Sequence, residues 1–457
     1  MSLLRSELFH FAESVTPKRS RMVINFRILN FRQLLTPTLL MLLWSSSLSA
    51  QHVYRFAFGV AKASGSYQHV LSDTSYTGER GYGFEPGGNI SCVERQMKGA
   101  PSGFCTSEKP FYFSVALPEG NYFVRITFGD FEKESSTTVK AELRRLMLER
   151  VDTPAGKFVT RTFVVNVRTP AIPGGGEVKL KDREKTTEAW AWDEKLTLEF
   201  NNSHPAISTI EITRADKLPT IYLLGDSTVC DQPSEPYNSW GQMLTRFFNP
   251  IVAIANNAES GESLRSSLNA RRLDKVASGL KPGDYLLIQY GHNDEKEKGE
   301  GVGAFTTYKA DLKKFVEVAR AHGATPVLIT PVQRRTFDDQ GRITNSHGDY
   351  PEAVRQVARE EKVALIDLHA MSTKFYEALG PEKSKLAFKE GDGTHHNNYG
   401  SYELAKCVVE GIRATKLGLA KFLVTDVPPF DPSRPDALES FSVPPSPLVN
   451  HTKPLGS

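Results

Sequence analysis

The spacing of apolar and polar residues changes once along the chain. In the first half, apolar residues alternate with others in short runs such as YRFAF (54–58), RTFVVNVRT (161–169) and KLTLEF (195–200). The stretch FYFSVALPEGNYFVRITFGD (111–130) indicates two strands joined by a Pro-Glu-Gly-Asn turn. Short alternating runs separated by turn residues predict a β-sandwich. We therefore expect an all-β domain over residues 51–215, with the charged stretch KDREK (181–185) in an exposed loop.

After Arg214 the pattern is that of an α/β protein. Helical spacing, as in YKADLKKFVEVARAHG (308–323) and YPEAVRQVAREE (350–361), separates short apolar runs: TIYLLGD (220–226), DYLLIQYG (284–291), TPVLITPV (325–332) and VALIDL (363–368). This succession predicts a parallel sheet covered by helices. We expect the α/β domain to span residues 216–424 and the proline-rich residues 425–457 to form an extended tail.

Residues 1–50 have the pattern of an export signal. Basic residues precede an apolar run from Leu34 to Trp44, and small residues lead to Ala50, after which we expect cleavage. The run is shorter than the about 20 apolar residues that span a bilayer, so we expect a periplasmic or secreted protein with no stable membrane span after cleavage. The alternatives are an uncleaved membrane anchor and a start at Met22.

The charge balance and the cysteines bear on three features: nucleic-acid binding, disulfides and metal sites. The chain has 56 basic and 53 acidic residues, a balance too even for a protein that neutralises many phosphates, so we expect no nucleic-acid partner. Cys92 and Cys105 are close in sequence and suited to a disulfide in an oxidising compartment, although spacing alone does not fix the pairing. No CxxC or HExxH spacing occurs, and we expect no metal and no cofactor.

Candidate chemical groups follow the strands of the α/β part. In open parallel sheets, reactive groups gather at the carboxyl ends of the strands. Three candidate strands end in polar stretches that contain glycine, namely Gly225-Asp226-Ser227, Glu259-Ser260-Gly261 and Gly291-His292-Asn293-Asp294. We expect Ser227 to lie at a helix N-terminus. A fourth stretch, DGTHHNNYG (392–400), places Asp392 three residues before His395.

These groups suffice for acyl transfer. A serine hydroxyl becomes a nucleophile when a neutral imidazole takes its proton, and a carboxylate holds that imidazole in one tautomer. His395 and Asp392 supply the base and its partner for Ser227. The oxyanion donors available are the backbone N–H groups of Ser227 and Gly261 and the side-chain amide of Asn293.

The four stretches resemble, in order, the blocks of the SGNH (GDSL-type) hydrolases. Within that superfamily the sequence is most similar to rhamnogalacturonan acetylesterases, whose second block, NxAxxGxSxRS, and last block, DxTHxNxxG, are matched here by Asn256, Ala258, Gly261, Ser263, Arg265, Ser266, Asp392, Thr394, His395, Asn397 and Gly400. The resemblance implies a flavodoxin-like three-layer α/β/α fold and the roles given above for Ser227, Gly261, Asn293, Asp392 and His395. Glu262 departs from the arginine often found after the block glycine, which leaves the substrate detail open.

The β-rich segment resembles the galactose-binding-like jelly roll that precedes this hydrolase domain in some pectin-degrading esterases. The resemblance implies a serine esterase that removes acetyl groups from pectic polysaccharide or oligosaccharide (rhamnogalacturonan). The alternatives are an SGNH esterase acting on other acetylated glycans or on lipids, and a non-catalytic carbohydrate-binding protein.

Several neighbouring residues have a structural interpretation beside a functional one. We expect Asp226 to fix the turn, His292 and His396 to be hydrogen-bonded loop histidines, and Cys230 to be a small buried residue. For Arg265, a contact to an acidic sugar and a salt bridge are equally open. Trp190 and Trp192, in AWAWDE, are candidates for a sugar-stacking platform, and core packing is the favoured use.

Overall fold

The structure is a computed structural model that describes residues 52–59, 65–94 and 103–455. The predicted leader, its cleavage point after Ala50 and the alternative start at Met22 lie outside these residues. Among the described residues, no helix is long and apolar enough to cross a membrane.

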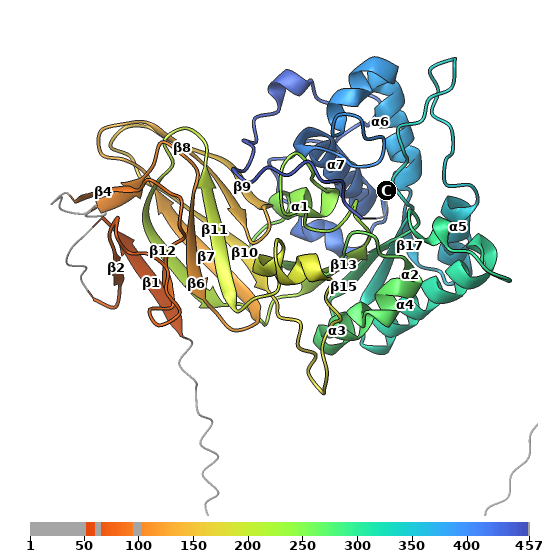
Figure 1. The fold of residues 1–457 in the computed structure, drawn as a ribbon, viewed down its shortest axis with the longest axis horizontal. Helices are drawn as coiled ribbons and strands as arrows, with labels where there is room; N and C mark the ends of the chain where they lie inside the picture. Colours follow the sequence, from red (N-terminus) through yellow and green to blue (C-terminus); the bar gives the residue numbers. More distant parts are fainter. Residues whose placement is uncertain (1–51, 60–64, 95–102, 456–457) are drawn as a thin grey trace, which may run out of the picture. The chain divides into compact units, whose positions relative to one another are not determined.

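Two largely antiparallel sheets build the N-terminal part (Figure 1). One has the order β10-β7-β12-β1-β2, with β5 also paired to β12 and β4 paired to β5, and the other has the order β3-β6-β11-β8-β9. The strands are β1 (Val53–Phe58), β2 (Gln68–Val70), β3 (Tyr82–Phe84), β4 (Ser91–Glu94), β5 (Gly103–Thr106), β6 (Phe111–Ala116), β7 (Gly120–Phe128), β8 (Ser135–Ala141), β9 (Arg145–Thr153), β10 (Val159–Val167), β11 (Lys195–Asn201) and β12 (Ala206–Arg214).

Alternation along the strands explains why the two sheets pack face to face. On β7, Tyr122, Val124, Ile126 and Phe128 are buried, and Arg125 between them is exposed. Successive side chains of a strand point to opposite faces, so one face of β7 enters the core. That core is rich in phenylalanine, and the buried side chains come from both sheets. The sandwich predicted from the period of two is therefore confirmed.

A disulfide joins two neighbouring strands of the first sheet. Cys92 on β4 lies opposite Cys105 on β5 in the antiparallel register, and the two form a disulfide. The pairing that sequence spacing left open is thus given by the strand register.

A parallel sheet with the order β14-β13-β15-β16-β17 forms the second part. Its strands and helices are β13 (Thr220–Gly225), α1 (Trp240–Leu244), β14 (Ala253–Asn256), α2 (Leu264–Asn269), α3 (Arg272–Gly279), β15 (Tyr285–Gln289), α4 (Lys309–Ala321), β16 (Thr325–Ile329), α5 (Tyr350–Glu360), β17 (Ala364–Ile366), α6 (Leu368–Lys383) and α7 (Asn398–Ala414). The predicted boundary at 215/216 lies between the last antiparallel strand, β12, and β13.

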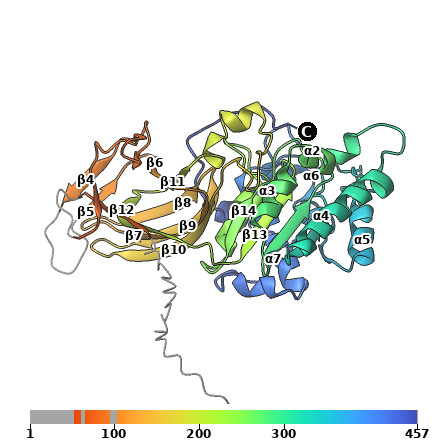
Figure 2. The same cartoon turned by 90° about the horizontal axis from the view of Figure 1, so that it is seen from below.

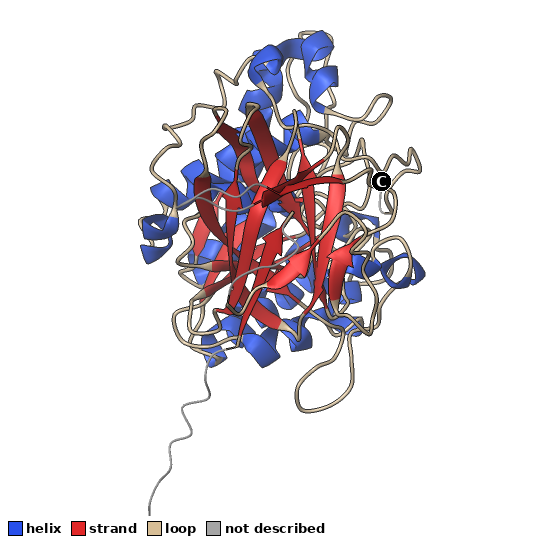
Figure 3. Cartoon of the chain, turned by 90° about the vertical axis from the view of Figure 1, so that its left-hand side faces the viewer, coloured by secondary structure: helices blue, strands red, loops and turns tan. Residues whose placement is uncertain are grey.

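The parallel sheet is covered on both faces. Leu223 of β13 and Leu287 of β15 belong to a core shared with α1, α6 and α7. Their neighbours Leu224 and Leu286 belong to a second core shared with α2, α3, α4 and α5. Figure 2 shows α4 and α7 on opposite sides of the sheet, and Figure 3 shows the strands flanked by helices. The three-layer α/β/α fold is therefore confirmed.

The C-terminal tail lies against both parts of the molecule. The Lys140 Nζ of β8 donates a hydrogen bond of 2.7 Å to the carbonyl of Pro444. The backbone N–H of Ser446 donates to the Glu235 carboxylate at 2.8 Å, and the N–H of Glu235 donates to the carbonyl of Leu448 at 2.8 Å. The tail has one short 3-10 helix, Leu438–Ser440, and these contacts connect the sandwich with the loop that precedes α1.

Candidate active site

Ser227 lies in the turn that follows β13. The turn is closed by the N–H groups of Val229 and Cys230, which both donate to the carbonyl of Asp226 at 3.0 Å. Gly225 precedes it, and a Cβ there would lie 2.6 Å from the backbone oxygen of Gln289, so only glycine fits. The Ser227 side chain is nearly fully buried.

The expectation that Ser227 lies at a helix N-terminus is wrong. The next helix, α1, begins at Trp240, and residues 226–230 form turns only. Pro233 and Pro236 follow the turn, and a proline cannot donate the N–H that a helix interior requires. The local backbone of the turn, and not a helix dipole, therefore surrounds the serine.

Ser227, His395 and Asp392 form one chain of hydrogen bonds. The Nε2 of His395 lies 2.9 Å from the Oγ of Ser227, and its Nδ1 lies 2.9 Å from the Oδ2 of Asp392. Asp392 Oδ1 also accepts the backbone N–H groups of Thr394 and His395 at 2.8 and 3.1 Å. These bonds fix the carboxylate in the loop before α7.

The carboxylate of Asp392 is held in its ionised form. Burial alone would raise its pKa, but the hydrogen bond from His395 and the two backbone N–H groups lower the pKa well below the usual range. An ionised Asp392 accepts the Nδ1–H of the imidazole, which leaves the Nε2 lone pair facing the serine hydroxyl. The geometry is that of a serine with its general base.

The second and third blocks lie beside the serine turn. Gln232 Nε2 donates both to the carbonyl of Ser227 at 2.8 Å and to the Oγ of Ser260 at 3.2 Å. Gly261 follows with φ +77°, a conformation that favours glycine. The Nδ2 of Asn293 donates to the carbonyl of Glu262 at 3.0 Å, and an amide nitrogen carries a second N–H that is suited to an oxyanion.

Two cations from the sandwich hold the Ser260–Gly261 peptide. Lys181 Nζ donates to the carbonyl of Ser260 at 2.6 Å, and Arg183 donates to the same oxygen at 3.1 Å. In a trans peptide the C=O and the following N–H point in opposite directions. Fixing the Ser260 oxygen therefore fixes the direction of the Gly261 N–H, which is a predicted oxyanion donor.

Comparison with known proteins agrees with this geometry. A family model described as GDSL-like lipase/acylhydrolase matches residues 223–401, and one described as beta-agarase/YXIM esterase-like, galactose-binding domain-like matches residues 54–155. The chain is 41% identical over 220 residues to the rhamnogalacturonan acetylesterase RhgT of Bacillus subtilis, covering 45% of this chain and 94% of that protein. The chain belongs to the GDSL-like lipase/acylhydrolase family.

Other relatives of this GDSL-family esterase span more of its length. It is 28% identical over 386 residues to the uncharacterized esterase YxiM of Bacillus subtilis, covering 81% of this chain and 92% of that protein. The crystal structure of YxiM covers 80% of this chain and 99% of its own, with 26% identity and a TM-score of 0.44.

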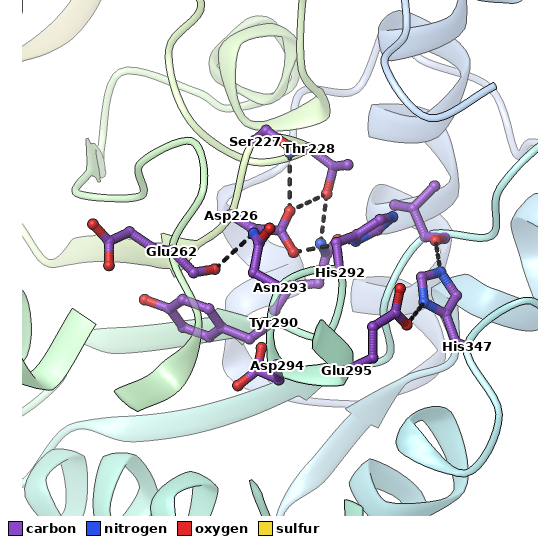
Figure 4. A network of polar contacts seen from close by, with 12 residues as sticks. Asp226, Ser227, Thr228, Glu262, Tyr290, His292, Asn293, Asp294, Glu295 and His347 are labelled. Carbon is purple, nitrogen blue, oxygen red and sulfur yellow. Dashed lines mark hydrogen bonds and ion pairs between the residues drawn. The ribbon is translucent and has the colours of Figure 1, made fainter. Parts of the chain in front are cut away.

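Asp226 and His292 of this GDSL-family esterase support the turn. Asp226 Oδ1 accepts from the backbone N–H and the hydroxyl of Thr228 at 3.0 and 2.8 Å, and Oδ2 lies 3.2 Å from the Nδ1 of His292 (Figure 4). Burial lowers the pKa of His292 to about 4, so the ring is neutral near pH 7. The structural interpretation of both residues is confirmed.

The remaining neighbours are also structural. His396 Nε2 lies 2.6 Å from the hydroxyl of Tyr376, and burial lowers the pKa of His396 to about 3. Arg265 forms a salt bridge of 2.7 Å with Asp311, as one of its two interpretations has it, and its side chain is 47% exposed. Cys230 is buried, as expected, and burial raises its pKa to about 12. Within the part of the chain that the structure describes, no group of three or more His, Cys, Asp or Glu is placed to hold a metal ion.

Sequence reasoning missed the residues that connect the sandwich to the site. Arg145 Nε pairs with Asp231 at 2.7 Å, and Arg144 pairs with Glu235 at 2.5 Å, all four nearly fully buried. The loop from Asp231 to Glu235, in which every residue but Pro233 is buried, is therefore a buried seam between the sandwich and the α/β part. The KDREK stretch was expected to be exposed, which holds for its Asp182 and Lys185 but not for Glu184, which is buried.

Glu262 has its charge balanced by cations from both parts of the molecule. Its Oε1 lies 2.8 Å from Lys181 Nζ and 3.6 Å from the Nε of Arg272. The residue that departs from the family pattern is thus paired with a lysine about 80 positions earlier in the chain. The only sequence feature that could have pointed to this pair is the unusual acidic residue itself.

Proposed function

We propose that this esterase removes acetyl groups from pectic polysaccharide, of which rhamnogalacturonan is the main candidate, by a serine acyl-enzyme route. The observation that carries the proposal is the continuous hydrogen-bond chain from Ser227 Oγ through His395 to Asp392, with both links at 2.9 Å. The choice of substrate is supported by the 41% identity over 220 residues to a protein named a rhamnogalacturonan acetylesterase.

The proposed reaction has two halves. His395 Nε2 takes the proton of the Ser227 hydroxyl as its oxygen attacks the acetyl carbonyl carbon, and the carbonyl oxygen becomes an oxyanion bound by the predicted N–H donors. The C–O bond to the sugar then breaks, and His395 returns the proton to the leaving sugar oxygen. A water molecule attacks the acetyl-serine in the same way and releases acetate.

The proposal includes export from the cytoplasm. It is supported by the leader pattern of residues 1–50 and by the disulfide between Cys92 and Cys105, since disulfides persist in oxidising compartments. A polysaccharide that cannot enter the cell would meet the enzyme in the periplasm or outside.

The test compares acetate release from acetylated rhamnogalacturonan, acetylated xylan and an aryl acetate by the wild type and by Ser227→Ala. We expect release from rhamnogalacturonan and from the aryl acetate by the wild type only. Equal release by Ser227→Ala would contradict the nucleophile, and release from xylan without rhamnogalacturonan would contradict the pectic substrate.

A further inference from the structure

A cavity of about 520 Å³ lies where three segments of the chain meet. The sandwich contributes Tyr112, Glu142 and Trp190, the loop after the nucleophile contributes Pro233, and the tail contributes Leu448. Its rim is open to solvent, because Leu448 is 53% exposed and Thr187 is also exposed. The volume is within the roughly 300–1,000 Å³ typical of small-ligand sites.

Aromatic rings form one wall of this cavity. The rings of Trp190 and Tyr112 are 5.2 Å apart with their planes at 61°, and the Trp190 side chain is only partly buried. Trp192, the other tryptophan of the AWAWDE stretch, is 7% exposed and packs in a small core with the Arg168 guanidinium 4.5 Å from its ring. Core packing therefore accounts for Trp192, while Trp190 packs against the same core and also lines the cavity.

The polar groups of the wall carry no unbalanced charge. Glu142 lies in a turn with φ +57°, and its Oε1 accepts the N–H of Thr197 at 3.2 Å. Burial raises the pKa of Glu142 to about 8, so its carboxyl is largely protonated at neutral pH and can donate a hydrogen bond. The guanidinium of Arg144 is paired with Glu235. An uncharged ligand with hydroxyl groups and an apolar face matches such a wall better than a carboxylate does.

Two residues that line the cavity are close in sequence to residues that contact the candidate active site. Pro233 follows Gln232, whose side chain contacts the carbonyl of Ser227. Thr187 lies four residues after Arg183, whose guanidinium contacts the carbonyl of Ser260. The loop that contains Gln232 and the loop that contains Arg183 thus contact the backbone of Ser227 and Ser260 and also form walls of the cavity.

We propose that this cavity is a subsite for a neutral pyranose residue of the glycan chain, stacked on the indole of Trp190 and hydrogen-bonded by the Glu142 carboxyl. The proposal rests on the proposed function for its glycan, and it assigns the sandwich, the nucleophile loop and the tail a joint role in binding. A pyranose has one apolar face, which suits an aromatic ring, and hydroxyls around its edge.

The test measures glycan binding and acetate release separately. In a Ser227→Ala background, calorimetric titration with acetylated rhamnogalacturonan oligosaccharides compares Trp190→Ala, Trp190→Tyr and Lys185→Ala, an exposed residue of the same loop. We expect Trp190→Ala to weaken binding at least tenfold, and the other two variants to retain it within about threefold. With Ser227 restored, Trp190→Ala should raise KM for the polysaccharide, and Lys185→Ala should leave both KM and aryl acetate turnover unchanged.

Two results would overturn the subsite. One is equal affinity with and without the Trp190 indole in variants of unchanged Tm. The other is Trp190-dependent binding of an oligogalacturonide, which has uronate residues only. If the wild type releases no acetate from rhamnogalacturonan, the proposed substrate fails, and the same titrations with neutral acetylated xylo-oligosaccharides still decide on the subsite.

Discussion

The Nζ of Lys181 lies 2.6 Å from the carbonyl oxygen of Ser260, although the two residues belong to different parts of the fold. The same ammonium pairs with Glu262 at 2.8 Å. Since the Ser260 carbonyl and the Gly261 N–H belong to one peptide, the contact sets the direction of the Gly261 N–H, which is a predicted oxyanion donor. The sandwich thereby supports the predicted catalytic centre.

Removing this ammonium should slow the chemical step. We expect Lys181→Met to lower kcat for an aryl acetate about tenfold with little change in KM, because loss of a whole oxyanion donor lowers rates by about 10²–10³-fold and this residue acts through the peptide. Lys181→Arg should restore most of kcat. Steady-state kinetics with Lys185→Met as the control decide the matter, and a Lys181→Met effect on KM alone would point to substrate contact instead.

The tautomer of His395 depends on Asp392. An amide in its place would present an N–H to Nδ1, so that Nε2 would carry the proton and could not accept one from Ser227. We expect Asp392→Asn to lower kcat by about 10³–10⁴-fold while the protein remains folded. The exposed variant Asp431→Asn serves as the control. A fall of less than tenfold would show that the carboxylate does not hold the base.

The buried seam should contribute to stability. Arg145 and Asp231 are 1% and 2% exposed, and Asp231 also accepts from Asn256 at 2.8 Å. Asp231→Ala leaves a buried cation without its partner, which typically costs about 3–5 kcal/mol. We expect a clear fall in the denaturation midpoint. The exposed pair of Arg150 and Asp152 provides the contrast, since Arg150→Met should cost less than about 1 kcal/mol.

The free energy of unfolding should decrease as the pH is lowered from 7, because His396 is buried in its neutral form. The pKa of His396 is about 3 in the folded protein, and an unfolded histidine has a pKa near 6.5. Its contribution is complete above pH 6.5 and is lost as the pH falls, because the unfolded state then binds a proton that the folded state does not. By pH 5 the loss is about 2 kcal/mol.

We therefore expect His396→Gln to flatten the dependence of unfolding free energy on pH between 7 and 5. Glutamine retains a polar partner for the Tyr376 hydroxyl, so the comparison isolates the titration. Denaturant titrations at each pH measure the slope. Equal slopes for the two proteins would contradict a neutral, buried His396.

Contacts between residues of one sequence motif could be predicted from the sequence, because they depend on local geometry. Asp392 and His395 are three residues apart in one loop, and Gly225 and Ser227 follow directly from an apolar run. The strands could be predicted for the same reason, since the alternation of apolar and polar residues along a strand is a local pattern.

Contacts between segments that are distant in the sequence could not be predicted. Nothing near Lys181 indicates that it meets Ser260, and a charged KDREK stretch is as compatible with solvent as with a buried ion pair. The same holds for Arg145 and Asp231, whose pairing depends on how the sandwich packs on the loop after Ser227. The helix expected at Ser227 was wrong because two prolines downstream outweigh the usual strand-to-helix pattern.

We expect Ser227 to carry the acetyl group during turnover. Rapid acid quenching of the enzyme with an aryl acetate, followed by peptide mass spectrometry, tests it directly. We expect one acetyl group on the peptide that contains Ser227, and none on that peptide in Ser227→Ala. Acetylation of a different residue that disappears at the rate of turnover, or undiminished turnover by Ser227→Ala, would contradict it.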